Sequence, residues 1–415
     1  MTGRARANGE GSIFAYRNGY AAYVWVTTPG GTRARKWLYG QDRDELHGRW
    51  IDLQKQAKSG PVATKVPTLG AYLDYWLAEV VKPNLAPATA ANYDMFARLY
   101  VAPGLGAKRL DKLTVRDVQS WLNKVRQTCQ CCAQGKDAAR PAEGRKSERQ
   151  RCCAVGQCCD QRASDRTCRD AWTVLRNALS NAVREEIVTR NVAALVRVSK
   201  PRSRKVKPWS VEEARQFLES AQRDGDPRYA GYVLILILGL RRGELLGLPW
   251  SCVDLDGAEA TIGWQLQRIG GRLLHRETKT EASDAPLPLP GICLAALREH
   301  RQRQQTWQVE AGAAWHDSGL VMTTRYGGAL EPRNFHRDFK ARCAKAGVRV
   351  IPVHAVRRTC ASLLVALEVH PRVAMQILRH SQIAVTMNVY SEVSSKETRA
   401  ALKRLGESLG GTDEG

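Results

Sequence analysis

An apolar run and the charged stretch directly after it constrain the fold of this chain most. The run from Tyr232 to Leu238 holds no charged residue, which predicts a buried helix. Gly239 interrupts the run, and Arg241 and Glu244 follow where a core would otherwise continue. A buried guanidinium is costly unless it is paired, and two residues three apart share one face of a helix. The stretch is therefore either a surface ion pair on an amphipathic helix or part of a buried charged site.

Later parts of the chain favour the charged site. They add a second arginine, two histidines, a lysine and a tyrosine, and the lysine stands in Glu277-Thr278-Lys279-Thr280, which we expect near the tip of a hairpin. This inventory suits phosphodiester chemistry without a metal, because arginine forks match phosphate oxygens and histidine can move protons. The candidate site residues in chain order are Arg241, Glu244, Lys279, His354, Arg357, His380 and Tyr390.

The order of these residues resembles that of the tyrosine recombinases, the phage integrase family. Over most of the chain it is similar to the type with an N-terminal arm-binding domain, found in actinobacterial integrative elements and prophages. The resemblance implies a site-specific recombinase that cleaves and rejoins DNA through a 3′-phosphotyrosine on Tyr390, with no cofactor for catalysis. It implies that Arg241 and Arg357 stabilise charge on the phosphate, and that Lys279 protonates the departing 5′-oxygen.

The resemblance also implies roles for the remaining site residues. The sequence departs from the usual family pattern at two positions. His354 and His380 are expected to donate to the phosphate, and Glu244 is expected to orient Arg241. Arg358 stands where the family often has histidine, and Arg379 where it often has glycine. Neither change removes a catalytic group, and we expect Arg379 to add a phosphate contact.

Two other functions are compatible with much of this pattern. A type IB topoisomerase shares the nucleophile but relaxes one duplex, and a recombinase scaffold without activity would only bind DNA. An N-terminal β unit favours the integrase, because a relaxing enzyme needs no second class of DNA site. The intact residue set argues against the inactive scaffold.

The charge of the chain identifies its class of partner. The formal net charge is +23 and the pI is about 9.8, which is typical of a protein that binds a polyanion. We expect double-stranded DNA attachment sites, and the resemblance implies a homotetramer on DNA, with an excisionase and a host DNA-bending protein as further partners. Apolar stretches are too short to span a membrane and no secretory signal is recognised. We therefore expect a cytoplasmic, nucleoid-associated protein without a membrane partner.

The fold expected is multidomain and mainly α. Short strands rich in β-forming residues, followed by helical spacing from Asp42, predict a three-stranded β unit plus helix; a basic hairpin on a larger domain is the alternative. The expected parts are an arm-type DNA-binding unit at 1–60, an all-α core-binding domain at 66–198 with an insertion at 128–168, a basic linker at 199–208, an α+β catalytic domain at 209–410 and a tail at 411–415.

The insertion holds eight of the twelve cysteines and no histidine. Cysteines this dense in a cytosolic protein indicate structural zinc, although adjacent pairs replace the usual spacing of two intervening residues. A flexible loop of reduced thiols is the alternative. The candidate ligands are Cys129, Cys131, Cys132, Cys152, Cys153, Cys158, Cys159 and Cys168.

Overall fold

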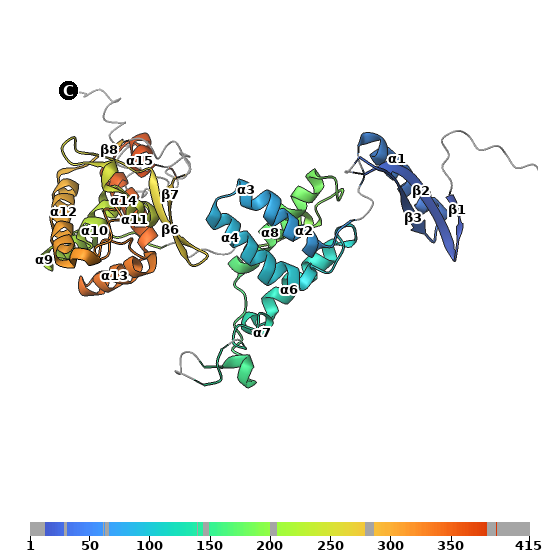
Figure 1. The fold of residues 1–415 in the computed structure, drawn as a ribbon, viewed down its shortest axis with the longest axis horizontal. Coiled ribbons are helices and arrows are strands. Elements are labelled where there is room, and N and C mark those ends of the chain that lie inside the picture. Colours follow the sequence, from blue (N-terminus) through green and yellow to red (C-terminus); the bar gives the residue numbers. More distant parts are fainter. Residues whose placement is uncertain are drawn as a thin grey trace, which may run out of the picture. The chain divides into compact units, whose positions relative to one another are not determined.

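The computed structural model describes residues 13–28, 31–60, 62, 66–138, 140–143, 149–199, 206–278, 286–379 and 387. It divides the chain into two compact units, Met1–Ser203 and Arg204–Gly415 (Figure 1). Each unit has hydrophobic clusters of its own. The two units are therefore described separately.

A three-stranded antiparallel sheet begins the first unit, in the order β1-β2-β3. Its strands are β1 (Ile13–Tyr16), β2 (Gly19–Thr27) and β3 (Arg33–Gly40), and helix α1 (Arg43–Ser59) follows with Asp42 as its N-cap. Alternate strand residues point to opposite faces. Ala22, Val24 and Val26 pack with Leu46, Trp50 and Leu53 of α1. The alternation therefore places one face against the helix and leaves the other open.

Helices form the rest of the first unit. They are α2 (Leu69–Tyr75), α3 (Lys82–Asn84), α4 (Pro87–Phe96), α5 (Ala102–Leu105), α6 (Val115–Gln127), α7 (Gln130–Ala133) and α8 (Asp165–Arg184), with π-helical turns at Trp76–Val81 and Ala97–Val101. Thr114 and Asp117 form a capping box that begins α6. The apolar faces of α6 and α8 meet in one core. Within the insertion, α7 packs on a 3₁₀ turn, η4 (Cys152–Val155).

The second unit is built around the predicted apolar helix, α10 (Tyr229–Ile237), which packs against four other helices (Figure 1). Those helices are α9 (Val211–Arg223), α11 (Arg242–Gly247), α12 (Gly291–Ala311) and α14 (Val353–Ala366); α13 (Pro332–Lys345) and α15 (Pro371–Leu378) complete the set. Ser210 and Glu213 begin α9 with the expected capping box. Eight of the nine residues of α10 are buried, which explains the absence of polar residues from the run.

Two small sheets accompany these helices. One has the order β4-β5-β8, and the other is the hairpin β6-β7. The strands are β4 (Val253–Asp254), β5 (Glu259–Thr261), β6 (Trp264–Ile269), β7 (Arg272–Glu277) and β8 (Pro286–Pro288). Gly270 and Gly271 turn the hairpin with positive φ. Lys279, which we expected near the tip of a hairpin, follows β7 in the sequence and lies outside the described residues.

The fold class predicted from the sequence is confirmed: a mainly helical, multidomain chain with a three-stranded N-terminal sheet. The expected last helix, 396–409, lies outside the described residues. Among the helices in the described part of the chain, none is long and apolar enough to cross a membrane.

Candidate active site

The turn from α10 into α11 places Arg241 and Glu244 together, as their spacing predicted. Arg241 is the N-cap of α11, and its Nη1 donates to Glu244 Oε1 at 2.5 Å. The backbone N–H of Arg241 donates to Glu244 Oε2 at 2.9 Å. The glutamate side chain is 4% exposed, whereas that of Arg241 is 51% exposed. Glu244 therefore fixes the backbone and the side chain of Arg241 while the guanidinium still reaches solvent.

Arg379 is the partner of Glu244 that the sequence did not reveal. Its Nη2 donates to Glu244 Oε2 at 2.8 Å, and the arginine side chain is only 2% exposed. The expected phosphate contact of Arg379 is wrong in this structure, because burial and the ion pair direct the guanidinium to the glutamate. Arg379 follows α15 with φ of +49°, a left-handed conformation that glycine adopts most easily. The glycine often found at this position in the family was the available signal that a helix ends here.

Two glycines allow the elements around this site to approach closely. Gly239 has φ of +59°, and a Cβ there would stand 2.7 Å from Leu378 of α15. A Cβ on Gly247 would stand 2.4 Å from the backbone of Gln265 in β6. Larger residues at these positions would move α11 away from α15 or from β6, so both glycines help to position Arg241.

Helix α14 brings Arg357 to the same place from far along the chain. Its Nη1 donates to the carbonyl oxygen of Gly239 at 2.7 Å. Its Nη2 is buried and has no hydrogen-bond partner among the residues that the structure describes. His354 is exposed and lies one turn earlier on α14, so it shares a face with Arg357. This face can present an imidazole and a guanidinium to one ligand.

Positive charge exceeds negative charge in what we call the arginine cluster: Arg241, Arg357, Arg379 and Glu244. Burial and the neighbouring charge of Arg241 lower the pKa of the Arg357 guanidinium to about 9. Burial opposes ionisation of Glu244, but Arg379 and Arg241 hold the pKa of its carboxyl below the usual range. Glu244 thus stays ionised, and the cluster keeps a surplus of cations. Such a surplus favours an anionic ligand.

Three candidate residues lie outside the described part of the chain: Lys279, His380 and Tyr390. Of the seven residues predicted from the sequence, the structure describes Arg241, Glu244, His354 and Arg357. It brings the two arginines and the glutamate into one electrostatic cluster, with His354 on the adjoining turn of α14.

The open face of the N-terminal sheet carries aromatic and basic side chains together. Tyr23 stands opposite Trp37, and Trp25 stands opposite Arg35. The Arg35 guanidinium lies 4.7 Å from the ring centroid of Trp25 and 5.0 Å from that of Tyr23. Exposed Trp25, Trp37 and Tyr39 continue this face. Cations held over aromatic rings form a surface suited to nucleic acid.

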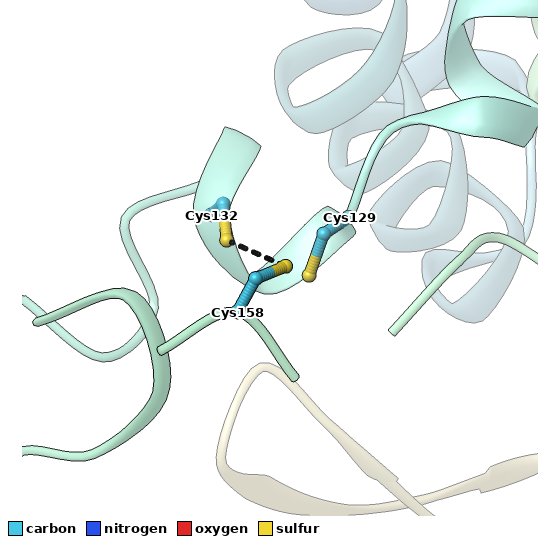
Figure 2. A group of neighbouring side chains, drawn as sticks. All are labelled: Cys129, Cys132 and Cys158. Atoms are coloured by element: carbon cyan, nitrogen blue, oxygen red, sulfur yellow. Dashed lines mark hydrogen bonds between the residues drawn. The ribbon is translucent and has the colours of Figure 1, made fainter. Parts of the chain in front are cut away.

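Seven cysteines of the insertion meet in a second cluster. In Figure 2 the sulfur atoms of Cys129, Cys132 and Cys158 point toward one another. Three overlapping groups, each within 4.8 Å, make up what we call the cysteine cluster: Cys129, Cys132 and Cys158; Cys131, Cys152 and Cys159; Cys132, Cys152 and Cys153.

Cys168 is not part of the cysteine cluster, which corrects the predicted set of eight ligands. It is fully buried in α8 and packs in the core of the helical domain. Helical periodicity places it there, beside Ala171 and Leu175 on the buried face of α8. Its nearness in sequence to the other cysteines was therefore misleading.

Comparisons with known proteins agree with this arrangement. The profile of the phage integrase family matches residues 209–397, and that of the phage integrase N-terminal SAM-like domain matches residues 68–126. The chain is 25% identical to a tyrosine recombinase XerC-like protein of Caldanaerobacter subterraneus subsp. tengcongensis, covering 94% of this chain and 97% of that one. It is 26% identical to an integrase of Streptomyces ambofaciens, covering 88% of each. These similarities do not favour the topoisomerase alternative.

The fold is also similar to a solved structure. The Tn1549 transposon integrase, in complex with transposon right end DNA, matches with a TM-score of 0.62 and 17% identity, covering 82% of this chain and 99% of that one. At this identity the similarity shows the fold.

Proposed function

Because the chain is a tyrosine recombinase of the phage integrase family, we propose that it integrates or excises a mobile element through a covalent intermediate on Tyr390. The observation that carries the proposal is the surplus of guanidinium groups in the arginine cluster. Arg241 and Arg357 come from different helices, and Arg357 makes no ion pair among the described residues. A phosphodiester supplies the anion that this arrangement lacks.

The proposed reaction divides the work among the site residues. The Tyr390 oxygen attacks the phosphorus, a 3′-phosphotyrosine forms, and the 5′-oxygen leaves with a proton from Lys279. Arg241 and Arg357 donate to the non-bridging oxygens, where charge grows in the transition state. Preorganised donors of this kind contribute ~10²–10³ each in rate. His354 and His380 donate to the same oxygens, and His354 can take the tyrosine proton.

Reversal of these steps rejoins the DNA. A 5′-hydroxyl attacks the phosphotyrosine, and the phenolate leaves more readily than an alkoxide would because its conjugate acid is stronger. The energy of the broken phosphodiester bond is kept in the phosphotyrosine, so the proposed chemistry uses side chains alone. Glu244 orients Arg241, and the contacts at both the backbone and the guanidinium support that role.

We propose that several surfaces of the chain bind DNA. The aromatic and basic face of residues 1–60 is the arm-type DNA-binding surface, and residues 66–198 form the core-binding domain. The linker 199–208 carries basic residues that would contribute counterion release along the phosphates. We propose that the catalytic domain at 209–410 also binds DNA. Residues 411–415 form the tail.

The proposed assembly follows from the chemistry of recombination. Exchange between two duplexes cleaves four strands, and each chain supplies one Tyr390, so we propose a homotetramer on the attachment sites. We propose an excisionase and a host DNA-bending protein as partners that control whether integration or excision occurs. The proposed location is the nucleoid, and the proposed source is an actinobacterial element. We propose that structural zinc occupies the cysteine cluster and takes no part in the reaction.

Replacement of the nucleophile tests the reaction. Tyr390→Phe should abolish covalent complexes with a nicked DNA substrate, because only the phenol oxygen is lost, while DNA affinity from basic contacts should persist. Tyr326→Phe is the matched control, since Tyr326 is an exposed tyrosine of the same unit. Denaturing gels of the trapped complexes provide the measurement. Strand cleavage by Tyr390→Phe would overturn the assignment of the nucleophile.

A further inference from the structure

The number of metal ions that the cysteine cluster can hold depends on which cysteines its three groups share. The first two groups share no residue, and together they contain six cysteines. The third group takes Cys132 from the first, Cys152 from the second, and adds Cys153. Cys153 therefore stands beside a sulfur of each of the other groups. The thiols of Cys131 and Cys132 both interact with it, which again joins the two groups through Cys153.

Tetrahedral zinc needs four ligands, and each of the first two groups has three. One further thiolate shared between both ions would complete both tetrahedra. We propose that the cysteine cluster is a two-zinc site in which Cys153 bridges the ions. One zinc binds Cys129, Cys132, Cys158 and Cys153, and the other binds Cys131, Cys152, Cys159 and Cys153.

The spacing of the sulfur atoms fits this chemistry. The sulfurs of Cys132 and Cys158, both assigned to one zinc, are 3.6 Å apart. Those of Cys129 and Cys159, assigned to different zincs, are 3.7 Å apart, so the two ion sites adjoin. A zinc–sulfur bond of about 2.3 Å gives a tetrahedron edge of about 3.8 Å. A disulfide would need about 2.05 Å. The Cys132–Cys158 distance thus matches two thiolates on one metal ion, and all seven cysteines are free of disulfides.

Backbone amides support the sulfurs from outside the cluster. The N–H of Cys159 donates to Cys152 Sγ at 3.0 Å, and that of Gln161 donates to Cys129 Sγ at 3.2 Å. The N–H of Asp160 donates to Cys158 Sγ at 3.3 Å. Donors in the outer shell of a metal site orient its ligands and stabilise their negative charge. The segment after the second cysteine pair is therefore already folded around the sulfurs.

The described residues of the insertion make polar contacts around Asp137 but have no apolar core of their own. Among its described residues before α8, burial is confined to Cys129, Gln130, Cys131 and Asp137, and none of these belongs to a hydrophobic cluster. Segments of this size without an apolar core commonly depend on metals or disulfides. Seven thiolates exceed two zinc ions in charge, and Lys136, Arg140 and Arg151 line the cavity beside them. Asp137 lines the same cavity and pairs with Arg140 and Arg151, so these cations offset only part of the excess.

This proposal rests on the proposed binding of zinc. The number of zinc ions per chain distinguishes the failure of the two-metal site from the failure of zinc binding itself. The full-length protein, purified under reducing conditions, should contain two zinc ions per chain by elemental analysis. One zinc per chain would retain zinc but overturn the two-metal site, and no zinc would overturn both. The chain with Cys168→Ser is the matched control and should keep both ions, because Cys168 lies outside the cluster.

Cobalt titration of the metal-free chain tests the bridge. A bridging thiolate couples two cobalt(II) ions magnetically, so the paramagnetic resonance signal should rise with the first equivalent and fall with the second. Cys153→Ser should remove the coupling, whereas Cys158→Ser should remove one terminal ligand of one ion only. In charge-transfer absorption, Cys153→Ser should therefore lose about twice the cobalt–sulfur intensity that Cys158→Ser loses. Signals that simply double at the second equivalent, or equal losses in both variants, would overturn the bridge.

Discussion

The arginine cluster and the cysteine cluster each gather several side chains of one chemical type, but they differ in what surrounds them. The arginine cluster stands on α11, α14 and α15, which carry buried apolar residues such as Leu245, Val356 and Leu378. The described part of the cysteine cluster has no hydrophobic cluster of its own. A core can hold cations together before a ligand arrives, whereas a site without a core depends on its ligand for its shape.

The difference is the one expected if the arginine cluster acts in catalysis and the cysteine cluster holds a structural metal. In the arginine cluster one carboxylate fixes Arg241, and Arg357 keeps an unpartnered nitrogen among the described residues. That surplus is useful only if a substrate anion relieves it. In the cysteine cluster every sulfur has a proposed place on a metal, so nothing is left to act on a substrate.

The largest expected effect concerns Lys279, the proposed general acid. Lys279→Ala should slow cleavage of an ordinary phosphodiester by ~10²–10⁴, because an alkoxide leaves poorly without a positioned acid. A substrate with sulfur at the bridging 5′ position should restore the rate, since a thiol with a pKa of about 8.5 leaves unprotonated. Single-turnover cleavage of both substrates provides the measurement.

Arg241→Ala is the matched variant for Lys279→Ala. Its defect should persist on the sulfur substrate, because its role is charge on the non-bridging oxygens, which the sulfur does not change. If Lys279→Ala is equally slow on both substrates, Lys279 is a DNA contact and another residue supplies the proton.

The next largest effect is expected from loss of the buried ion pair between Arg379 and Glu244. Arg379→Met should lower the free energy of opening of α11 and α15 by about 1.5–3 kcal/mol, because the buried Glu244 loses one charged partner and keeps only Arg241. Native-state hydrogen exchange of these helices provides the measurement. Arg325→Met removes an exposed pair with Glu310 in the same unit, and its cost should stay below about 1 kcal/mol.

A double variant distinguishes the ion pair from lost packing. Glu244→Gln combined with Arg379→Met removes the buried charge together with its partner, so it should be less destabilised than Arg379→Met alone. A double variant that is as unstable as the sum of the single ones would show that Arg379 acts through its packing.

A smaller effect is expected from acid. The Lys345 ammonium and the Arg342 guanidinium hold the pKa of Asp224 at about 2. Because this pKa is depressed, its contribution to stability is fully present above the unfolded value of about 3.9 and is lost as the pH falls toward 2. The melting temperature of the unit at 204–415 should therefore fall less steeply over this range in Asp224→Asn than in the wild type. Parallel slopes would mean that the ion pairs persist on unfolding.

The smallest effect is expected on the DNA cleavage rate when zinc is removed from the cysteine cluster. Removal of zinc by a chelator should increase hydrogen exchange across residues 129–162 and leave the single-turnover cleavage rate of bound DNA unchanged, because the proposed chemistry uses no residue of the insertion. Exchange and cleavage are measured on the same sample. A cleavage rate that falls with zinc would show that the insertion contributes to the active site.

The sequence alone determined much of this molecule, and for local reasons. The β-forming residues of β2 and β3, the helical spacing from Asp42 and the apolar run of α10 depend on neighbouring residues, and the structure confirms the element that each predicted. The spacing of Arg241 and Glu244 likewise predicted their contact. The order of the chemical groups was sufficient to indicate the family.

Only the tertiary structure decided which distant groups meet. Arg379 reaches Glu244 because α15 packs beside Gly239, and nothing near Arg379 in the sequence indicates that partner. Cys168 leaves the cysteine cluster because the apolar face of α8 turns it into a core, where burial of a small thiol is favourable. Pairings of this kind depend on the packing of whole elements. Spacing along the chain records faces of helices and strands, but it does not record which faces come together.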